Sequence, residues 1–188
     1  MTARSSAGAG GGLGAGDLRL RASALEWLIS DVDGVLTDGR LFYGPEGEAW
    51  KAFHVRDGLA FKLAQRAGLK VGVISARGGP ALRRRVHELG LDLVITNRED
   101  KRSAFRELLD EHGVSAERVA YVGDDLVDLP VLQRCGLSFA PADAAPEVRD
   151  RVDHMLTTPG GYGAVREMVE WILRARGDWD ELVDAYLG

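Results

Sequence analysis

The sequence contains only one cysteine, Cys135, so no disulfide bond can form within the chain. This composition is typical of a reducing compartment, and we expect a cytoplasmic protein in which Cys135 is a small buried hydrophobe. The sequence also lacks an apolar run of 18 residues, so we expect no membrane-spanning helix. It has no block of like charge and a pI near 5.4, which disfavours a nucleic-acid partner.

The first 24 residues have little apolar periodicity. They are rich in glycine, alanine and serine, and we predict a flexible tail over residues 1–24, ahead of one domain over 25–188. The tail has no apolar core typical of a secretory signal, and no Gly-Lys-Ser/Thr follows its glycines as in a phosphate-binding loop. Its few acidic residues leave an organellar transit peptide as the less favoured alternative.

The remaining residues alternate between apolar runs and amphipathic segments. The runs predict strands at Leu25–Ser30, Lys70–Ile74, Leu91–Ile95, Val119–Val122, Leu137–Phe139 and Asp153–Leu156. Helical spacing predicts helices at Arg56–Ala67, Pro80–Leu89, Arg102–Glu111, Leu126–Arg134, Ala164–Ala175 and Trp179–Leu187. Repeated strand–helix units of this length predict an α/β fold with a doubly wound parallel sheet.

One segment, residues 39–55, breaks this alternation. Its two short apolar stretches flank Gly44–Gly47 and predict a β-hairpin. The hairpin carries the aromatic residues Phe42, Tyr43, Trp50 and Phe53. It could fold back on its own domain, but we favour a flap that pairs with another subunit, because exposed strand edges are normally paired or protected.

Two acidic residues follow the first predicted strand. A strand has a side-chain period of two, so Asp31 and Asp33 should point the same way as the chain leaves the sheet. Two crowded carboxylates bind a divalent cation, or one of them stays protonated because its pKa is raised. In open α/β sheets, ligands bind beyond the carboxyl ends of the strands, where this pair should lie.

Three further polar clusters follow strands or open helices: Ser75-Ala76-Arg77, Lys101, and the acidic run over residues 123–128. Each alone is typical of a turn, a helix cap or a solvated surface lysine. Together they would place carboxylates, a hydroxyl and an ammonium on one rim. Those groups are the parts of metal-assisted phosphoryl transfer, since Mg²⁺ prefers oxygen ligands and cations stabilise the charge of the transferred group.

The order of these clusters resembles the motifs of the haloacid dehalogenase-like (HAD) phosphatase superfamily. The chain is most similar to its capless 3-deoxy-D-manno-octulosonate 8-phosphate phosphatases, and the segment between the first two clusters has room only for the hairpin, not for a cap domain. The segments that carry the resemblance are Asp31–Gly39, Lys51–Gly58, Ile74–Arg77, Val119–Asp128 and Gly163–Glu167.

The resemblance implies a role for each matching residue. Asp31 would be the nucleophile that forms an aspartyl-phosphate, and Asp33 the general acid and base. Mg²⁺ would be held by the Asp31 carboxylate, the Asp33 backbone carbonyl and Asp124. Ser75 and the Ala76 amide would bind the phosphate, and Lys101 would neutralise its charge.

Residues implied to contact the substrate are His54, Val55, Arg56, Asp57, Gly58, Lys62, Arg77, Arg85 and Asp125. Arginines suit a substrate with both a phosphate and a carboxylate, because a guanidinium binds either group bidentately. Without the resemblance, Arg85 would be interpreted as part of a solvated helix face. The chain departs from the family pattern at four positions: His54 replaces asparagine, Lys62 arginine, Ala76 glycine and Tyr162 arginine.

The resemblance therefore implies a Mg²⁺-dependent phosphatase of 3-deoxy-D-manno-octulosonate 8-phosphate that serves lipopolysaccharide biosynthesis as a homotetramer. Two alternatives stay open: a phosphatase of a related nonulosonate 9-phosphate, and a HAD-fold binding module that has lost turnover. A phospho-receiver domain is disfavoured, because Leu93–Ile95 is followed by Thr96 and not by a phosphoacceptor aspartate.

Overall fold

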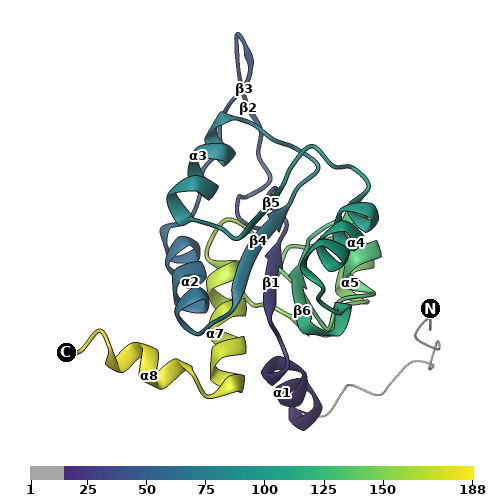
Figure 1. The fold of residues 1–188 in the computed structure, drawn as a ribbon. Helices are drawn as coiled ribbons and strands as arrows, with labels where there is room; N and C mark the ends of the chain where they lie inside the picture. Colours follow the sequence, from purple (N-terminus) through teal and green to yellow (C-terminus); the bar gives the residue numbers. More distant parts are fainter. Residues whose placement is uncertain (1–14) are drawn as a thin grey trace.

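The computed structural model describes residues 15–188, and a parallel six-stranded sheet runs through them (Figure 1). The strand order is β5-β4-β1-β6-β7-β8, and every neighbouring pair is parallel. The strands are β1 (Trp27–Ser30), β4 (Lys70–Ile74), β5 (Leu93–Ile95), β6 (Val119–Val122), β7 (Leu137–Ala140) and β8 (His154–Met155). The predicted α/β class, parallel sheet and strand positions are confirmed.

The chain changes direction across the sheet at β1. It adds β4 and β5 on one side of β1 and then returns to add β6, β7 and β8 on the other. The carboxyl ends of β1 and β6 therefore flank a topological switch point, where helices connect on opposite faces of the sheet and leave a crevice for ligands.

Helices cover both faces of the sheet (Figure 1). One apolar layer joins the sheet to α1 (Ala15–Ser23), α2 (Val55–Arg66), α3 (Pro80–Leu89), α7 (Ala164–Arg176) and α8 (Trp179–Asp184). The other layer joins it to α4 (Lys101–His112), α5 (Leu129–Leu132) and α6 (Pro146–Arg149). Because both faces are covered, the central strands are mostly apolar, which made them recognisable in the sequence.

The prediction of a flexible tail over residues 1–24 is wrong for its last part. Residues 15–23 form α1, whose Ala22 is fully buried. The Arg21 guanidinium donates hydrogen bonds to the Gly136 carbonyl (2.7 Å from Nε) and to both Asp153 carboxylate oxygens (3.0 and 2.7 Å). These distant partners fix the helix, and local sequence could not show them. The rest of the predicted tail, residues 1–14, lies outside the described residues.

The predicted helix over Leu126–Arg134 is also corrected. Residues Leu126–Asp128 form a single 3₁₀ turn, and only Leu129–Leu132 are α-helical. Pro130 lies in the first turn of α5, where its missing N–H is tolerated but the turn before it cannot continue as a regular helix. The C-terminal helix α8 is likewise shorter than predicted and ends at Asp184.

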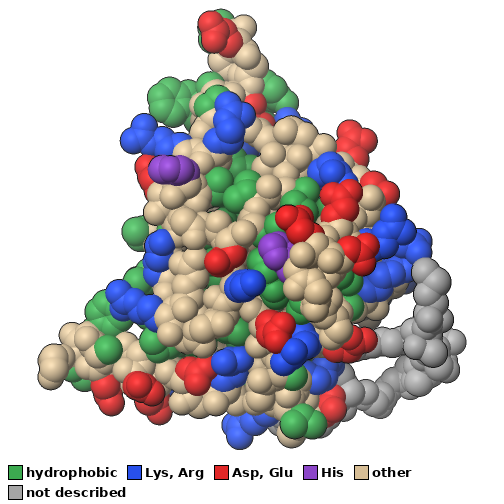
Figure 2. All heavy atoms as spheres, viewed as in Figure 1, with side chains coloured by type: hydrophobic (Ala, Val, Ile, Leu, Met, Phe, Trp, Pro, Cys, Tyr) green, Lys and Arg blue, Asp and Glu red, His purple; other side chains and the backbone are tan. Residues whose placement is uncertain are grey.

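The predicted hairpin is present and projects beyond the carboxyl ends of the strands (Figure 1). Its strands β2 (Phe42–Gly44) and β3 (Gly47–Trp50) are antiparallel. Phe53 packs against the core, but the hairpin does not fold back to bury its other three aromatic side chains: Phe42, Tyr43 and Trp50 are 45%, 67% and 73% exposed. Figure 2 shows the hairpin standing out from the body with hydrophobic side chains beside it. Among the described residues, no helix has the length and apolarity needed to span a membrane.

Candidate active site

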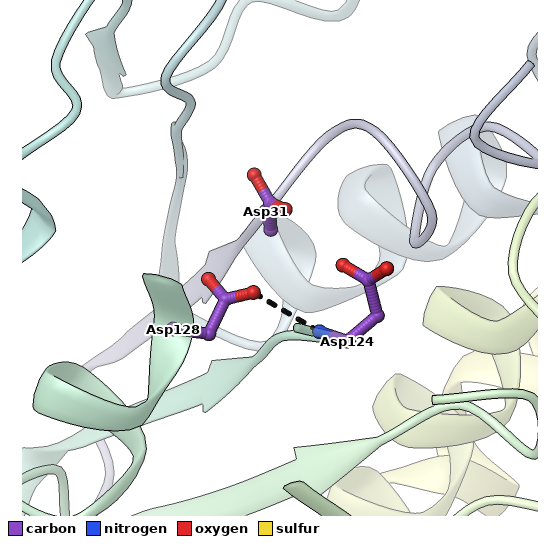
Figure 3. Close-up of side chains that lie close together, drawn as sticks. All are labelled: Asp31, Asp124 and Asp128. Atoms are coloured by element: carbon purple, nitrogen blue, oxygen red, sulfur yellow. Dashed lines mark hydrogen bonds between the residues drawn. The ribbon is translucent and has the colours of Figure 1, made fainter. Parts of the chain in front are cut away.

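Two carboxylates meet at the switch point between β1 and β6. Ser30 and Val122, the last residues of these strands, are paired in register, and the Asp31 N–H donates to the Val122 carbonyl at 2.9 Å. Asp31 and Asp124 therefore leave the sheet side by side, and their carboxylates lie close together beyond the strand ends (Figure 3). The sequence prediction that these two residues share one rim is confirmed.

A third carboxylate, Asp128, organises this pair, and the predicted set of site residues missed it. Its Oδ1 accepts hydrogen bonds from the Lys101 ammonium and the Tyr121 hydroxyl, both at 2.6 Å. Its Oδ2 accepts from the backbone N–H groups of Asp124 (3.1 Å) and Asp125 (3.2 Å). The signal was the third acid of the run over residues 123–128, spaced to cap the turn that carries Asp124.

The Lys101 ammonium lies between the carboxylates of Asp31 and Asp128, so Lys101 is not a solvated surface lysine. Its side chain is 1% exposed, and its ammonium is 2.7 Å from Asp31 Oδ1 and 2.6 Å from Asp128 Oδ1. Burial alone would lower the pKa of Lys101, but the two carboxylates raise it above its ordinary value. The site therefore holds a fixed positive charge beside Asp31.

The site nevertheless has an excess of negative charge. Burial and the Asp128 charge raise the pKa of Asp31 to about 7, and burial with the charges of Asp31 and Asp128 raises that of Asp124 to about 8. Asp124 Oδ1 is buried and has no hydrogen-bond partner among the described residues. Because oxygen atoms of Asp31, Asp124 and Asp128 all lie within 4.8 Å of one another, the residues fit a hard divalent cation.

Gly34 makes room for this arrangement. It has a φ of +89°, and a Cβ added there would lie 2.0 Å from Asp124 Oδ2. A side chain at this position would displace the Asp124 carboxylate, so the turn after β1 requires glycine for two separate reasons.

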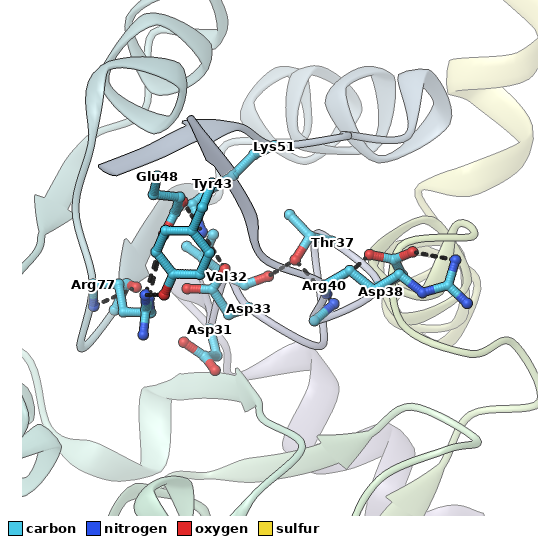
Figure 4. Close-up of polar contacts among 12 residues, drawn as sticks. Asp31, Val32, Asp33, Thr37, Asp38, Arg40, Tyr43, Glu48, Lys51 and Arg77 are labelled. Atoms are coloured by element: carbon cyan, nitrogen blue, oxygen red, sulfur yellow. Dashed lines mark hydrogen bonds and ion pairs between the residues drawn. The ribbon is translucent and has the colours of Figure 1, made fainter. Parts of the chain in front are cut away.

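Asp33 is not one of the three clustered carboxylates and is paired with Lys51, a residue that the sequence prediction gave no role (Figure 4). Lys51 also pairs with Glu48 of the hairpin at 2.9 Å, and its side chain is 1% exposed. Burial would lower the pKa of Lys51, but Asp33 and Glu48 raise it. The only signal in the sequence was its place in the Lys51–Gly58 segment.

Ser75 and Arg77 follow β4 on the other side of β1. Ser75 is buried, and its Oγ accepts a hydrogen bond from the Arg77 N–H at 3.1 Å. The Arg77 guanidinium reaches the hairpin, with Glu48 and the Tyr43 hydroxyl at 3.4 and 3.3 Å (Figure 4). Ala76 lies between Ser75 and Arg77, so the predicted phosphate-binding turn is next to the hairpin.

Some predicted substrate residues form a second group on α2 and α3. His54, Asp57, Gly58 and Arg85 line one pocket together with Leu36, which belongs to the segment that follows Asp31. A Cβ on Gly58 would lie 2.3 Å from Arg85 Nη2, so the glycine admits the guanidinium. Burial raises the pKa of Asp57 to about 6, and Asp57 Oδ2 and His54 Nδ1 are buried without hydrogen-bond partners in the described part of the chain.

The other predicted substrate residues do not line this pocket. The Lys62 ammonium donates to the Leu89 carbonyl, and Val55 is 76% exposed. Asp125 accepts a hydrogen bond from the Leu126 N–H at 2.7 Å. Arg56 lines a separate groove beside α7, together with Tyr162.

Comparison with known proteins agrees with this geometry. Residues 91–167 match the haloacid dehalogenase-like hydrolase family. The 3-deoxy-D-manno-octulosonate 8-phosphate phosphatase of Haemophilus influenzae is 51% identical over 153 residues, which cover 81% of this chain and 85% of that protein. Its counterpart in Escherichia coli K12 is 41% identical over 165 residues, which cover 88% of each chain.

The chain belongs to the 3-deoxy-D-manno-octulosonate 8-phosphate phosphatase family. The cobalt-bound structure of the Haemophilus influenzae member superposes with a TM-score of 0.86 at 46% identity, covering 89% of this chain and 99% of that one. A Moraxella catarrhalis member, solved with magnesium, phosphate and KDO, has a TM-score of 0.87 at 33% identity and covers 90% and 98%. The resemblance expected from the motifs is therefore confirmed.

Proposed function

We propose that this protein is a Mg²⁺-dependent phosphatase that hydrolyses 3-deoxy-D-manno-octulosonate 8-phosphate to the free sugar acid and phosphate. The observation that carries the proposal is the buried cluster in which Lys101 joins Asp31 to Asp128, with Asp124 beside them. The cluster combines a nucleophile, a fixed cation and oxygen ligands for a metal, and the relatives named above supply the substrate.

Asp31 is proposed as the nucleophile. One of its carboxylate oxygens attacks phosphorus, the bond between phosphorus and the sugar oxygen breaks, and an aspartyl-phosphate forms. The Asp31 and Asp124 carboxylates with the Asp33 backbone carbonyl would hold Mg²⁺. When bound, the ion would neutralise the repulsion among the carboxylates and let an anionic phosphate approach Asp31.

Asp33 is proposed as the general acid and base. Its carboxyl group gives a proton to the leaving sugar oxygen in the first step. In the second step, the same carboxylate takes a proton from water as the water oxygen attacks phosphorus. Asp31 then leaves as a carboxylate, and inorganic phosphate is released.

The remaining predicted residues stabilise charge and select the substrate. Lys101, the Ser75 hydroxyl and the Ala76 amide would neutralise and bind the phosphate oxygens. His54, Asp57, Gly58 and Arg85 would contact the sugar acid, together with Val55, Arg56, Lys62, Arg77 and Asp125 in the assembled enzyme.

The exposed hairpin supports a homotetramer in which the flap of one subunit covers the rim of another. A site without a cap domain is open to water, and a neighbouring flap would close it. Three exposed aromatic side chains on so small a projection also favour a protein partner. We place the enzyme in the cytoplasm, in lipopolysaccharide biosynthesis.

Phosphate release from a panel of eight- and nine-carbon keto-sugar acid phosphates and simple hexose phosphates, with and without Mg²⁺, tests the proposal. We expect Mg²⁺-dependent release with strong preference for the eight-carbon acid. Preference for a nine-carbon acid would retain the mechanism and change the substrate. No release from any member by folded, metal-bound protein would favour a binding module.

A further inference from the structure

The ion pair between Asp33 and Lys51 has no part in the chemistry described above, yet the Lys51 side chain in it is 1% exposed. We propose that Lys51 is a positioning residue that fixes the orientation of the Asp33 carboxyl group and connects it to the hairpin. This inference rests on the proposed function, because it assigns Lys51 to the general acid of that reaction.

The position of the Lys51 ammonium supports this role. It lies between two carboxylates, Asp33 and Glu48, and its side chain is 1% exposed, against 19% and 16% for its partners (Figure 4). Burying an ammonium costs free energy unless it is paired. Lys51 therefore has little freedom to leave Asp33, and a long, normally mobile side chain becomes a fixed support.

The contact also gives the two carboxylate oxygens of Asp33 different surroundings. Oδ1 accepts the hydrogen bond from Lys51, whereas Oδ2 is buried and accepts none from the described residues. A carboxyl group held through one oxygen has a restricted orientation, which general acid catalysis requires. Lys51 thus fixes how the Asp33 carboxyl group is oriented.

Beyond Lys51, the contacts continue through the hairpin to the phosphate-binding turn. Glu48 pairs with Arg77 at 3.4 Å, and Arg77 donates through its N–H to Ser75 Oγ at 3.1 Å. The other strand of the hairpin, β2, also contacts Arg77: the Arg77 guanidinium donates a hydrogen bond to the Tyr43 hydroxyl at 3.3 Å. The hairpin is therefore connected both to Asp33, the proposed general acid, and to the proposed phosphate-binding turn at Ser75.

The test is a double-mutant cycle between Lys51→Met and Asp33→Asn. Turnover of 3-deoxy-D-manno-octulosonate 8-phosphate is measured at saturating Mg²⁺ in steady state and, for the slow variants, with enzyme in excess. Lys70→Met is the matched control, because Lys70 is exposed at the opposite end of the sheet and contacts Trp27. Thermal unfolding of each variant checks the fold, and Lys51→Gln replaces Lys51→Met if the latter is unfolded at the assay temperature.

We expect Lys51→Met to lower kcat by about 10- to 100-fold, within the range of general acid catalysis, and to change KM by less than about twofold. Lys51→Arg should recover about tenfold of that loss, because the cation is retained. In the Asp33→Asn background, Lys51→Met should change kcat by less than about threefold, since the effect passes through Asp33.

Two results would overturn the inference: wild-type kcat for folded Lys51→Met, or the same loss in both backgrounds. The latter would mean that Lys51 acts independently of Asp33. Failure of the unsubstituted protein to release phosphate, or full turnover by Asp33→Asn, would instead contradict the proposed function on which the inference rests. The two kinds of failure are therefore separated within one set of measurements.

Discussion

Gly34→Ala should damage metal binding far more than its backbone conformation alone would predict. The position has a φ of +89°, where a non-glycine residue costs about 1–2 kcal/mol. In addition, the new Cβ would lie 2.0 Å from Asp124 Oδ2, against an ordinary contact of 3.4 Å or more. The Asp124 carboxylate must therefore move by more than about 1 Å, a misplacement that can reduce the rate by about 100-fold.

Gly39→Ala is the matched control, because it separates backbone strain from displacement of Asp124. Gly39 also has a positive φ, +75°, but a Cβ there would be no closer than 3.6 Å to its nearest neighbour, Gly34 Cα. Both variants should lose about 1–2 kcal/mol of unfolding free energy. Only Gly34→Ala should also bind its metal more weakly, by about 10- to 100-fold.

Isothermal titration of each variant with Mg²⁺, combined with the Mg²⁺ dependence of phosphate release, measures this difference. We expect weak binding and low kcat/KM for Gly34→Ala, and near-normal Mg²⁺ affinity for Gly39→Ala. Equal Mg²⁺ affinities in the two variants would refute the assignment of Asp124 as a ligand.

Three further variants test other parts of the account. Lys101→Met removes the cation beside Asp31 and should lower kcat by about 100- to 1000-fold in steady-state assays; a loss below about tenfold would contradict its role. Arg21→Ala should cost about 2 kcal/mol of unfolding free energy at pH 7 in urea titrations. Burial raises the pKa of Asp153, but hydrogen bonds from Arg21 and Ser138 outweigh burial and hold this pKa below its ordinary 3.8. The stabilisation by Arg21 is therefore present above pH 3.8 and is lost as the pH falls through the lower pKa of the folded state. The gap between Arg21→Ala and the unsubstituted protein should therefore narrow in acid, and a constant gap would show that Asp153 is not involved. Trp50→Ala removes the most exposed aromatic side chain of the hairpin and should lower the tetrameric fraction in light scattering; a monomeric, fully active unsubstituted protein would contradict the proposed assembly.

Much of the sheet could be predicted because parallel strands buried on both faces are continuous apolar runs, such as Val119–Val122. Helix ends were also readable where local chemistry sets them, as at Pro80 and Gly90 around α3. Helix α1 could not be predicted, because the contact that fixes it joins Arg21 to Asp153, 132 residues away.

The candidate site was predictable where its residues follow strands and less so where it depends on contacts between loops. Asp31 comes directly after β1 and Asp124 follows β6 after Gly123, so sheet topology brings them together. Burial of Lys101 contradicts the usual behaviour of a lysine, and its position at the start of a predicted helix placed it on the rim without indicating that it is buried. The pairing of Lys51 with Asp33 requires the folded hairpin, and no local pattern in the sequence indicates it.

The central claim, that Asp31 carries the phosphoryl group, is tested most directly by rapid acid quenching of the protein with phosphorus-labelled substrate and Mg²⁺. Peptide mapping then locates the label. The account predicts protein-bound phosphate on Asp31 and neither label nor turnover in a folded Asp31→Asn variant. Label on another residue, or substantial turnover by Asp31→Asn, would contradict it.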